Sequence, residues 1–324
     1  MGQTVAPRPV SLRSQPKEAP KKPATLKTGD WRADLLLLLV AIIWGFGFVA
    51  QRAGMEHVGP LTYNGLRFLL GGLCLIPFAR RESRHRCSDQ TLLSRFAGVI
   101  AGLVLFGGAT LQQWGIQFTT AGKAGFITGI YVVLVPVLGL LWGRRTGGGT
   151  WLGAMLSVAG LYLLTGQGNM RVATGDLLVL LGAVFWALHV LVLSVLSPRC
   201  PPLRLARDQF FCCAILSLVL ALITEEILPA AIARAAGPIL FGGLVSVGIG
   251  YTLQVVAQQR ANPAHAAIIL SLETVFAVLG GWLLLDERLG RGALVGCCLM
   301  LAGMIVSQVR GDGGKMEDPS RPGR

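Results

Sequence analysis

The chain has 324 residues, of which 53% are hydrophobic and only 14% are charged, with a mean hydropathy of +0.62. Soluble domains normally carry about 25% charged residues, so this composition excludes an ordinary soluble fold. The net charge of +13 lies in the two ends of the chain and in alternate short connections, not on one polar surface, which argues against a nucleic-acid partner. The sequence therefore predicts an integral membrane protein.

Residues 1–33 hold basic residues among prolines and serines, and this segment is too long and polar to begin a signal peptide. We expect it to be a disordered cytoplasmic tail. Ten apolar stretches follow, each near the ~20 residues with which a helix crosses a bilayer. They are 34–52, 60–79, 96–118, 122–142, 149–167, 176–197, 204–224, 236–258, 263–285 and 292–309. Residues 310–324 are expected to form a second cytoplasmic tail.

The two halves of the chain repeat each other with a shift of 142 residues, which carries Asp34 to Asp176 and Trp44 to Trp186. The same shift carries Pro60, Phe68 and Gln112 to Pro202, Phe210 and Gln254. Five stretches in each half are an odd number, so the second half must cross the membrane in the opposite sense. We therefore predict an all-α integral membrane fold of ten transmembrane helices, built as two inverted five-helix repeats over 34–167 and 176–309. Inverted repeats are typical of secondary transporters.

The distribution of Lys and Arg predicts the orientation, because cytoplasmic connections carry an excess of these residues. With a cytoplasmic N-terminus, the cytoplasmic connections hold the basic groups in 80–86, 144–145, 199–207 and 260. The opposite side holds Arg52, Lys123, Arg171, Arg234, Arg288 and Arg291. We therefore expect a multi-pass protein of the inner or plasma membrane, with both termini in the cytoplasm and the lipid bilayer around it.

Several kinds of chemistry lack their sequence signals. Five of the seven cysteines lie in apolar stretches and none forms a C-x-x-C pair, so we expect neither disulfides nor a metal site. No nucleotide-binding, zinc-hydrolase or serine-hydrolase motif occurs, so we expect no cofactor, no ATP-driven transport and no enzyme activity. An intramembrane enzyme acting on a lipid or isoprenoid substrate stays open as the alternative, although it would need clustered carboxylates or histidines.

Three stretches carry a family resemblance, namely Trp44-Gly45, the run TTAGKAGFITGIY over 119–131 with Pro136, and LSLETVF over 270–276 leading to LDERL over 285–289. Residues 34–309 resemble EamA-type permeases of the drug/metabolite transporter superfamily. The resemblance implies movement of a small-molecule substrate without ATP, often export of an amino acid or a related compound. The sequence departs from the family at Arg144, where a glutamate is usual, and at Thr274, where a proline is common.

Glu273 is the clearest candidate for a functional residue within the apolar stretches. It lies about ten residues into 263–285, close to the bilayer midplane at ~1.5 Å per residue. His265 lies two turns earlier on the same helical face. A carboxyl buried there costs a few kcal/mol and favours its neutral form, which suits protons as the coupling ion. The alternative is a carboxyl that only bridges two helices.

Two basic residues are also candidates. Arg67 could bind a substrate carboxylate or phosphate through two parallel hydrogen bonds, or it could extend to the membrane surface. Lys123, the repeat partner of His265, lies two turns before Tyr131. Its side chain either lines a substrate path or extends to the membrane surface.

Amides and aromatic rings at matching repeat positions complete the candidate site. Glutamines such as Gln112 and Gln254 either bridge helices or bind a polar substrate. Trp44, Trp186 and His189 either pack or bind an amine through cation–π contacts. The candidate substrate or coupling residues are Glu273, Arg67, Trp44, Gln112, Tyr131, Trp186, His189, Gln254, His265 and Lys123.

Overall fold

The computed structural model describes residues 31–82, 96–118, 121–143, 146–165, 174–285 and 291–310, together with Gly2. Every regular element in these ranges is a helix. The predicted tails lie outside the described residues, apart from Gly2 and the few positions that begin the first helix and end the last. The structure therefore agrees with an all-α fold over the part of the chain that it describes.

The first half of the chain forms α1 (Trp31–Gly54), α2 (Pro60–Arg81), α4 (Ala97–Gln117), α5 (Ala121–Gly129), α6 (Tyr131–Leu141) and α7 (Gly148–Thr165). The second half forms α8 (Thr174–Leu196), α9 (Pro202–Thr224), α10 (Pro229–Arg234), α11 (Ala236–Leu240), the π-helix η2 (Phe241–Tyr251), α12 (Thr252–Ala257), α13 (Pro263–Leu270), α14 (Glu273–Leu285) and α15 (Arg291–Arg310). Within the described ranges, eight helical segments are long and apolar enough to cross a membrane, and Gly148–Leu163 and Leu294–Ser307 are shorter apolar helices.

Prolines begin the helices of several stretches. Pro60, Pro202 and Pro263 are the first residues of α2, α9 and α13, where a missing backbone N–H costs nothing and the fixed φ suits the helix. Asn262 caps α13, because its side-chain oxygen accepts a hydrogen bond from the N–H of Ala264 at 2.9 Å.

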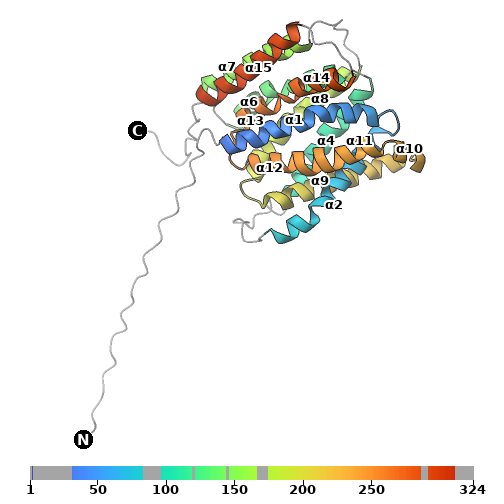
Figure 1. Ribbon diagram of the computed structural model, residues 1–324. Helices are drawn as coiled ribbons and strands as arrows, with labels where there is room; N and C mark the ends of the chain where they lie inside the picture. The colour runs from blue at the N-terminus through green and yellow to red at the C-terminus, as the bar shows by residue number, and fades with distance from the viewer. Residues whose placement is uncertain are drawn as a thin grey trace.

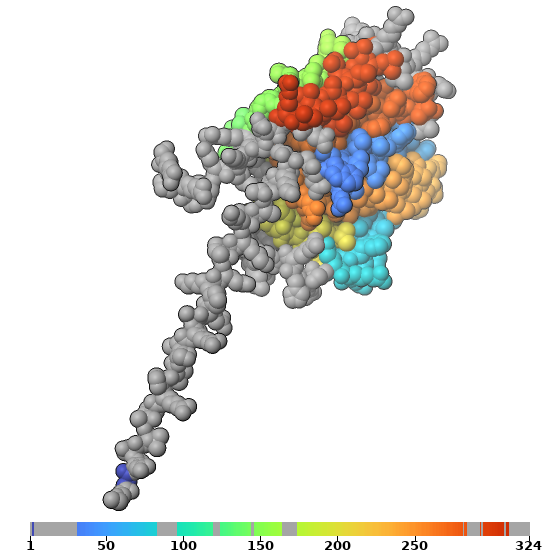
Figure 2. Space-filling model, turned by 60° about the vertical axis from the view of Figure 1, so that its left-hand side comes forward, coloured from blue at the N-terminus to red at the C-terminus, as the bar shows by residue number. Residues whose placement is uncertain are grey.

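Two helix pairs lie at opposite edges of the molecule, α7 beside α15 and α2 beside α9, and the remaining helices fill the space between them (Figure 1). The space-filling view shows the same order, from α15 in red past α1 in blue to α2 in cyan (Figure 2). Glycines bring α7 and α15 together, because a Cβ at Gly153 would lie 2.6 Å from the Gly303 carbonyl oxygen, and a Cβ at Gly303 equally close to that of Gly153. Such backbone contact is typical of membrane helix pairs.

Polar and apolar side chains are distributed as expected for a protein surrounded by lipid. Large apolar residues such as Leu141, Leu222 and Ile223 are at least 74% exposed, whereas Gln113 and Gln209 are fully buried. A soluble protein rarely exposes contiguous apolar surface on this scale. The outer surface of the helix bundle therefore suits a hydrocarbon environment.

Two of the predicted stretches are interrupted near their middle. Stretch 122–142 breaks at Ile130, between α5 and α6, and stretch 263–285 breaks at Ser271 and Leu272, between α13 and α14. At each break the backbone tightens, since Ile130 N–H donates to the Ile127 carbonyl at 3.2 Å and Leu272 N–H to the Ile269 carbonyl at 3.1 Å. The 142-residue shift carries one break onto the other. Pro136, in contrast, lies inside α6.

The stretch at 236–258 contains an unusual helix form. Its central part, η2, is a π-helix that packs against α1 and α2. Trp44 of α1 donates its indole N–H to the Ser246 carbonyl oxygen of η2 at 3.3 Å. π-Helical turns frequently mark functional sites, because they shift the side chains that follow them.

Candidate functional site

A small cavity lies where helices of both halves meet. It is lined by Trp44, Gln51, Arg67, Gln112, Thr128, Tyr131, Trp186, Val190, Ser246, Tyr251, Gln254, Leu270 and Glu273. The space open to the centres of water-sized molecules is about 30 Å³. That volume holds roughly two waters, at about 10–15 Å³ of this measure for each. In this conformation the cavity is therefore narrow.

The cavity brings together most of the residues that the sequence singled out. Those that line it are Trp44, Arg67, Gln112, Tyr131, Trp186, Gln254 and Glu273. His189 and His265 are not among the lining residues. Lys123 belongs to α5, and its side chain lies outside the described part of the structure.

The guanidinium group of Arg67 is deeply buried in α2, at 2% exposure. Its Cζ lies 5.4 Å from the ring centre of Tyr63 and 5.0 Å from that of Phe68, so aromatic faces support the positive charge. Its Nε has no hydrogen-bond partner among the described residues, and no described carboxylate forms an ion pair with it. A buried cation in this state can receive an anionic group.

Glu273 and Tyr131 reach the cavity from the two interrupted stretches. Glu273 is the first residue of α14 and is 4% exposed, whereas Tyr131 is the first residue of α6. Both side chains line the cavity, and the Tyr131 hydroxyl has no hydrogen-bond partner among the described residues. Next to them, Thr274 donates its hydroxyl hydrogen to the Gly125 carbonyl of α5 at 3.0 Å. The two breaks therefore place a carboxyl and a phenol together at the cavity.

Tyr251, at the end of η2, was not singled out in the sequence, although it lines the cavity. Its ring centre lies 4.5 Å from that of Trp44 and 6.0 Å from that of Trp186, and the Tyr251 ring stacks on the Trp186 ring. It also contacts the rings of Phe68 at 5.8 Å and His189 at 6.3 Å. The repeat gave no signal for this residue, because its counterpart in the first half is an alanine.

Several buried polar atoms around the cavity have no hydrogen-bond partner among the described residues. They are Gln51 Oε1, Arg67 Nε, Tyr131 Oη, Trp186 Nε1 and Gln254 Oε1. Leaving one buried polar group unsatisfied costs about 1–3 kcal/mol, so a concentration of five around one cavity indicates polar occupants. Gln112 differs, since its amide donates to Thr128 Oγ1 at 3.3 Å.

The two histidines have other neighbours. His189 Nε2 lies 3.0 Å from Gln209 Oε1, and its ring meets Trp186 edge-on at 6.2 Å, so it stands just behind the cavity wall. His265 lies at the start of α13, where Nε2 is 3.3 Å from Asp34 Oδ1 and Nδ1 is 3.1 Å from Ser307 Oγ. The expectation that His265 shares a face with Glu273 assumed an unbroken helix, whereas the helix breaks between the two residues, after Leu270.

The apolar exterior, the buried polar cavity and the long apolar helices define a polytopic α-helical membrane protein. The profile of the EamA-like transporter family matches residues 31–166 and again residues 173–308. The chain belongs to this family.

Relatives and a solved structure agree with the family. An uncharacterized transporter of Archaeoglobus fulgidus is 32% identical over 286 residues, which are 86% of each chain. The uncharacterized transporter YoaV of Bacillus subtilis is 23% identical over 280 residues, which are 84% of this chain and 94% of the relative. A protein of known crystal structure superposes with a TM-score of 0.73 at 18% identity, covering 87% of this chain and 98% of its own. That similarity shows the fold alone.

Proposed function

We propose that the protein is a secondary transporter of ten transmembrane helices, in which two inverted repeats expose the cavity to each side of the membrane in turn. The fifth and tenth helices would be the shorter apolar helices within α7 and α15. Both termini would lie in the cytoplasm, as the basic residues predict. A polar cavity lined by discontinuous helices supports this proposal, because such helices commonly form substrate sites in transporters with inverted repeats.

Matched contacts on the two sides of the cavity support the inverted repeat. A Cβ at Gly250 would lie 2.8 Å from Trp44 Nε1, and a Cβ at Gly108 would lie 3.2 Å from the Trp186 ring. The 142-residue shift relates Trp44 to Trp186 and Gly108 to Gly250. It also relates Tyr131 to Glu273, so these two cavity residues would lie near the axis between the repeats.

The substrate that best suits the cavity is a small zwitterion, such as an amino acid or a related compound. Arg67 would bind its carboxylate, because the guanidinium is buried and forms no ion pair with a described carboxylate. The aromatic rings of Trp44, Trp186 and Tyr251 would receive an ammonium group through cation–π contacts, with the Glu273 carboxyl nearby. This combination of one cation, one carboxyl and three rings is the observation that carries the proposal.

The proposed direction of transport is based on the family, and the proposed coupling to protons is based on Glu273. We propose export, since members of the family that this sequence resembles often export such compounds. Glu273 would exchange protons with each side as the cavity alternates, because burial favours its neutral form and water contact its charged form.

The test is counterflow in liposomes that contain the purified protein. Vesicles loaded with an unlabelled α-amino acid should accumulate the radiolabelled form, whereas the matching amine and the matching carboxylic acid should each exchange poorly. Equal exchange of the acid would remove the role of the aromatic rings, and equal exchange of the amine would remove the role of Arg67. Formation of a new product without flux would support the intramembrane enzyme instead.

A further inference from the structure

Helices α2 and α9 are joined at one end by a glutamate that follows α9. Glu225 is the C-cap residue of α9, and its carboxylate reaches the start of α2. Oε1 accepts a hydrogen bond from Leu61 N–H and Oε2 from Thr62 N–H, each at 2.8 Å. Gly59 leaves the necessary space, since a Cβ there would collide with the carboxylate.

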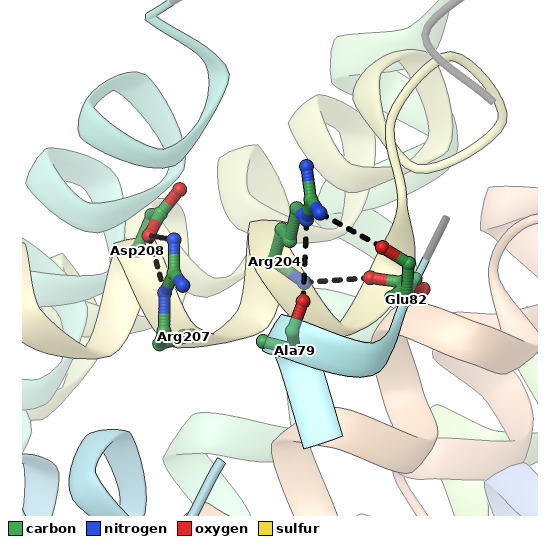
Figure 3. A network of polar contacts seen from close by, with 5 residues as sticks. All are labelled: Ala79, Glu82, Arg204, Arg207 and Asp208. Carbon is green, nitrogen blue, oxygen red and sulfur yellow. Dashed lines mark hydrogen bonds and ion pairs between the residues drawn. The ribbon is translucent and has the colours of Figure 1, made fainter. Parts of the chain in front are cut away.

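The opposite end of the pair has the reciprocal arrangement. Glu82, the C-cap residue of α2, accepts hydrogen bonds from the N–H groups of Leu203 at 3.3 Å and Arg204 at 3.1 Å, at the start of α9. Arg204 returns the contact, because its guanidinium donates to the carbonyl oxygens of Ala79 at 3.3 Å and Glu82 at 2.8 Å (Figure 3). Each helix therefore caps the other, and the two must run antiparallel.

These hydrogen bonds satisfy groups that a helix cannot satisfy by itself. The first N–H groups of a helix have no acceptor within it, and a carboxylate there is also favoured by the helix dipole. Hydrogen bonds to an ionised acceptor are roughly twice as strong as neutral ones. At both ends the acceptor comes from the other repeat, so the contacts bind the two halves of the chain to each other.

Between the two ends, α2 and α9 pack without spare room. A Cβ at Gly65 would lie 2.5 Å from Leu218 Cδ2, and a Cβ at Gly72 would lie 3.0 Å from the Phe211 ring. The rings of Phe68 and Phe210 meet at 6.2 Å. The pair therefore resists both separation and sliding along its length.

We propose that Glu82, Arg204 and Glu225 are positioning residues that keep α2 and α9 together as one rigid pair throughout transport. Arg67 belongs to α2, so the same contacts fix the height of its guanidinium in the cavity. The cavity then opens by movement of the helices next to the breaks at 130 and 271–272, while α2 stays packed against α9. The inference goes beyond the proposed function, because it holds for any substrate.

The first test measures hydrogen exchange at single backbone amides in the purified full-length protein. Glu225→Gln should speed the exchange of the Leu61 and Thr62 amides by about tenfold or more, since one charge-assisted hydrogen bond is worth about that factor. Glu226→Gln removes the same charge from the exposed neighbouring side chain and should leave both amides unchanged. Equal exchange rates in Glu225→Gln and the wild type would show that the Glu225 carboxylate does not hold α2 to α9, and would overturn the proposal.

The second test joins the pair covalently. Leu218 Cγ lies 2.6 Å from the position of a Gly65 Cβ, which brings Gly65→Cys and Leu218→Cys within reach of a disulfide, for which the two Cβ atoms must lie roughly 3.5–4.5 Å apart. Val190→Cys, at the cavity wall, would report how fast a small maleimide reaches the cavity in right-side-out and in inverted vesicles. If α2 and α9 stay together while the cavity opens, the oxidised protein, which carries the disulfide, and the reduced protein should be labelled at equal rates from each side of the membrane. A rate that falls from either side on oxidation would overturn the proposal. Neither measurement uses a substrate, so failure here differs from failure of the amino-acid proposal.

Discussion

Replacing Arg67 by lysine would keep the positive charge in the cavity and remove the planar fork of donors. A carboxylate held by arginine makes two parallel charge-assisted hydrogen bonds, whereas an ammonium acts as a point charge. Hydrogen bonds to charged groups are worth about 1.5–3 kcal/mol each. Loss of one of the two therefore weakens substrate binding about 10- to 100-fold, at about 1.4 kcal/mol for each factor of ten.

The assay is the substrate concentration that gives half-maximal counterflow, measured at equal amounts of reconstituted protein. Arg80→Lys is the matched control, because Arg80 is exposed near the end of the same helix. Arg67→Met should retain the wild-type thermal midpoint while abolishing exchange, since it removes a buried charge that no described carboxylate pairs with. Wild-type half-saturation in Arg67→Lys would refute the carboxylate role, and a large loss of stability in Arg67→Met would assign Arg67 to the fold.

Three further changes test the coupling, the packing and the orientation. Glu273→Gln should lose accumulation driven by a pH gradient and keep substrate exchange, because exchange needs no net release of protons; wild-type accumulation would leave Glu273 as a helix bridge. Gly153→Ala should cost about 1–3 kcal/mol in thermal unfolding, since its Cβ would lie 2.6 Å from a backbone oxygen, whereas Gly148→Ala meets open space and should be neutral. Cys87, in a connection outside the described residues, should react with an impermeant maleimide in inverted vesicles only; labelling in intact cells would reverse the orientation.

The positions of the helices could be predicted from the sequence, because a helix that crosses lipid needs about 20 apolar residues. The repeat between the halves also singled out Trp44, Trp186, Gln112 and Gln254, all of which line the cavity. These signals depend on composition and on self-similarity, which the chain carries directly.

The breaks and the π-helix could not be predicted in the same way. Ile130 and Leu272 are ordinary helix formers, and Pro136, the proline of the first interrupted stretch, lies six residues after the break. Tertiary contacts fix these sites, such as the hydrogen bond from Thr274 to the Gly125 carbonyl. Tyr251 was missed for a related reason, because its importance comes from rings on other helices.

The repeat matches Glu273 with a tyrosine, Tyr131, so the proposed coupling would use a single carboxyl. A duplicated carboxyl would give the axis two acids, whereas the first repeat supplies a phenol at that position. One carboxyl exchanges one proton per cycle, so the pH difference alone can sustain only about a tenfold concentration ratio per pH unit. A transporter with this coupling is better suited to releasing a solute that is abundant in the cytoplasm than to building a steep concentration gradient of a scarce one.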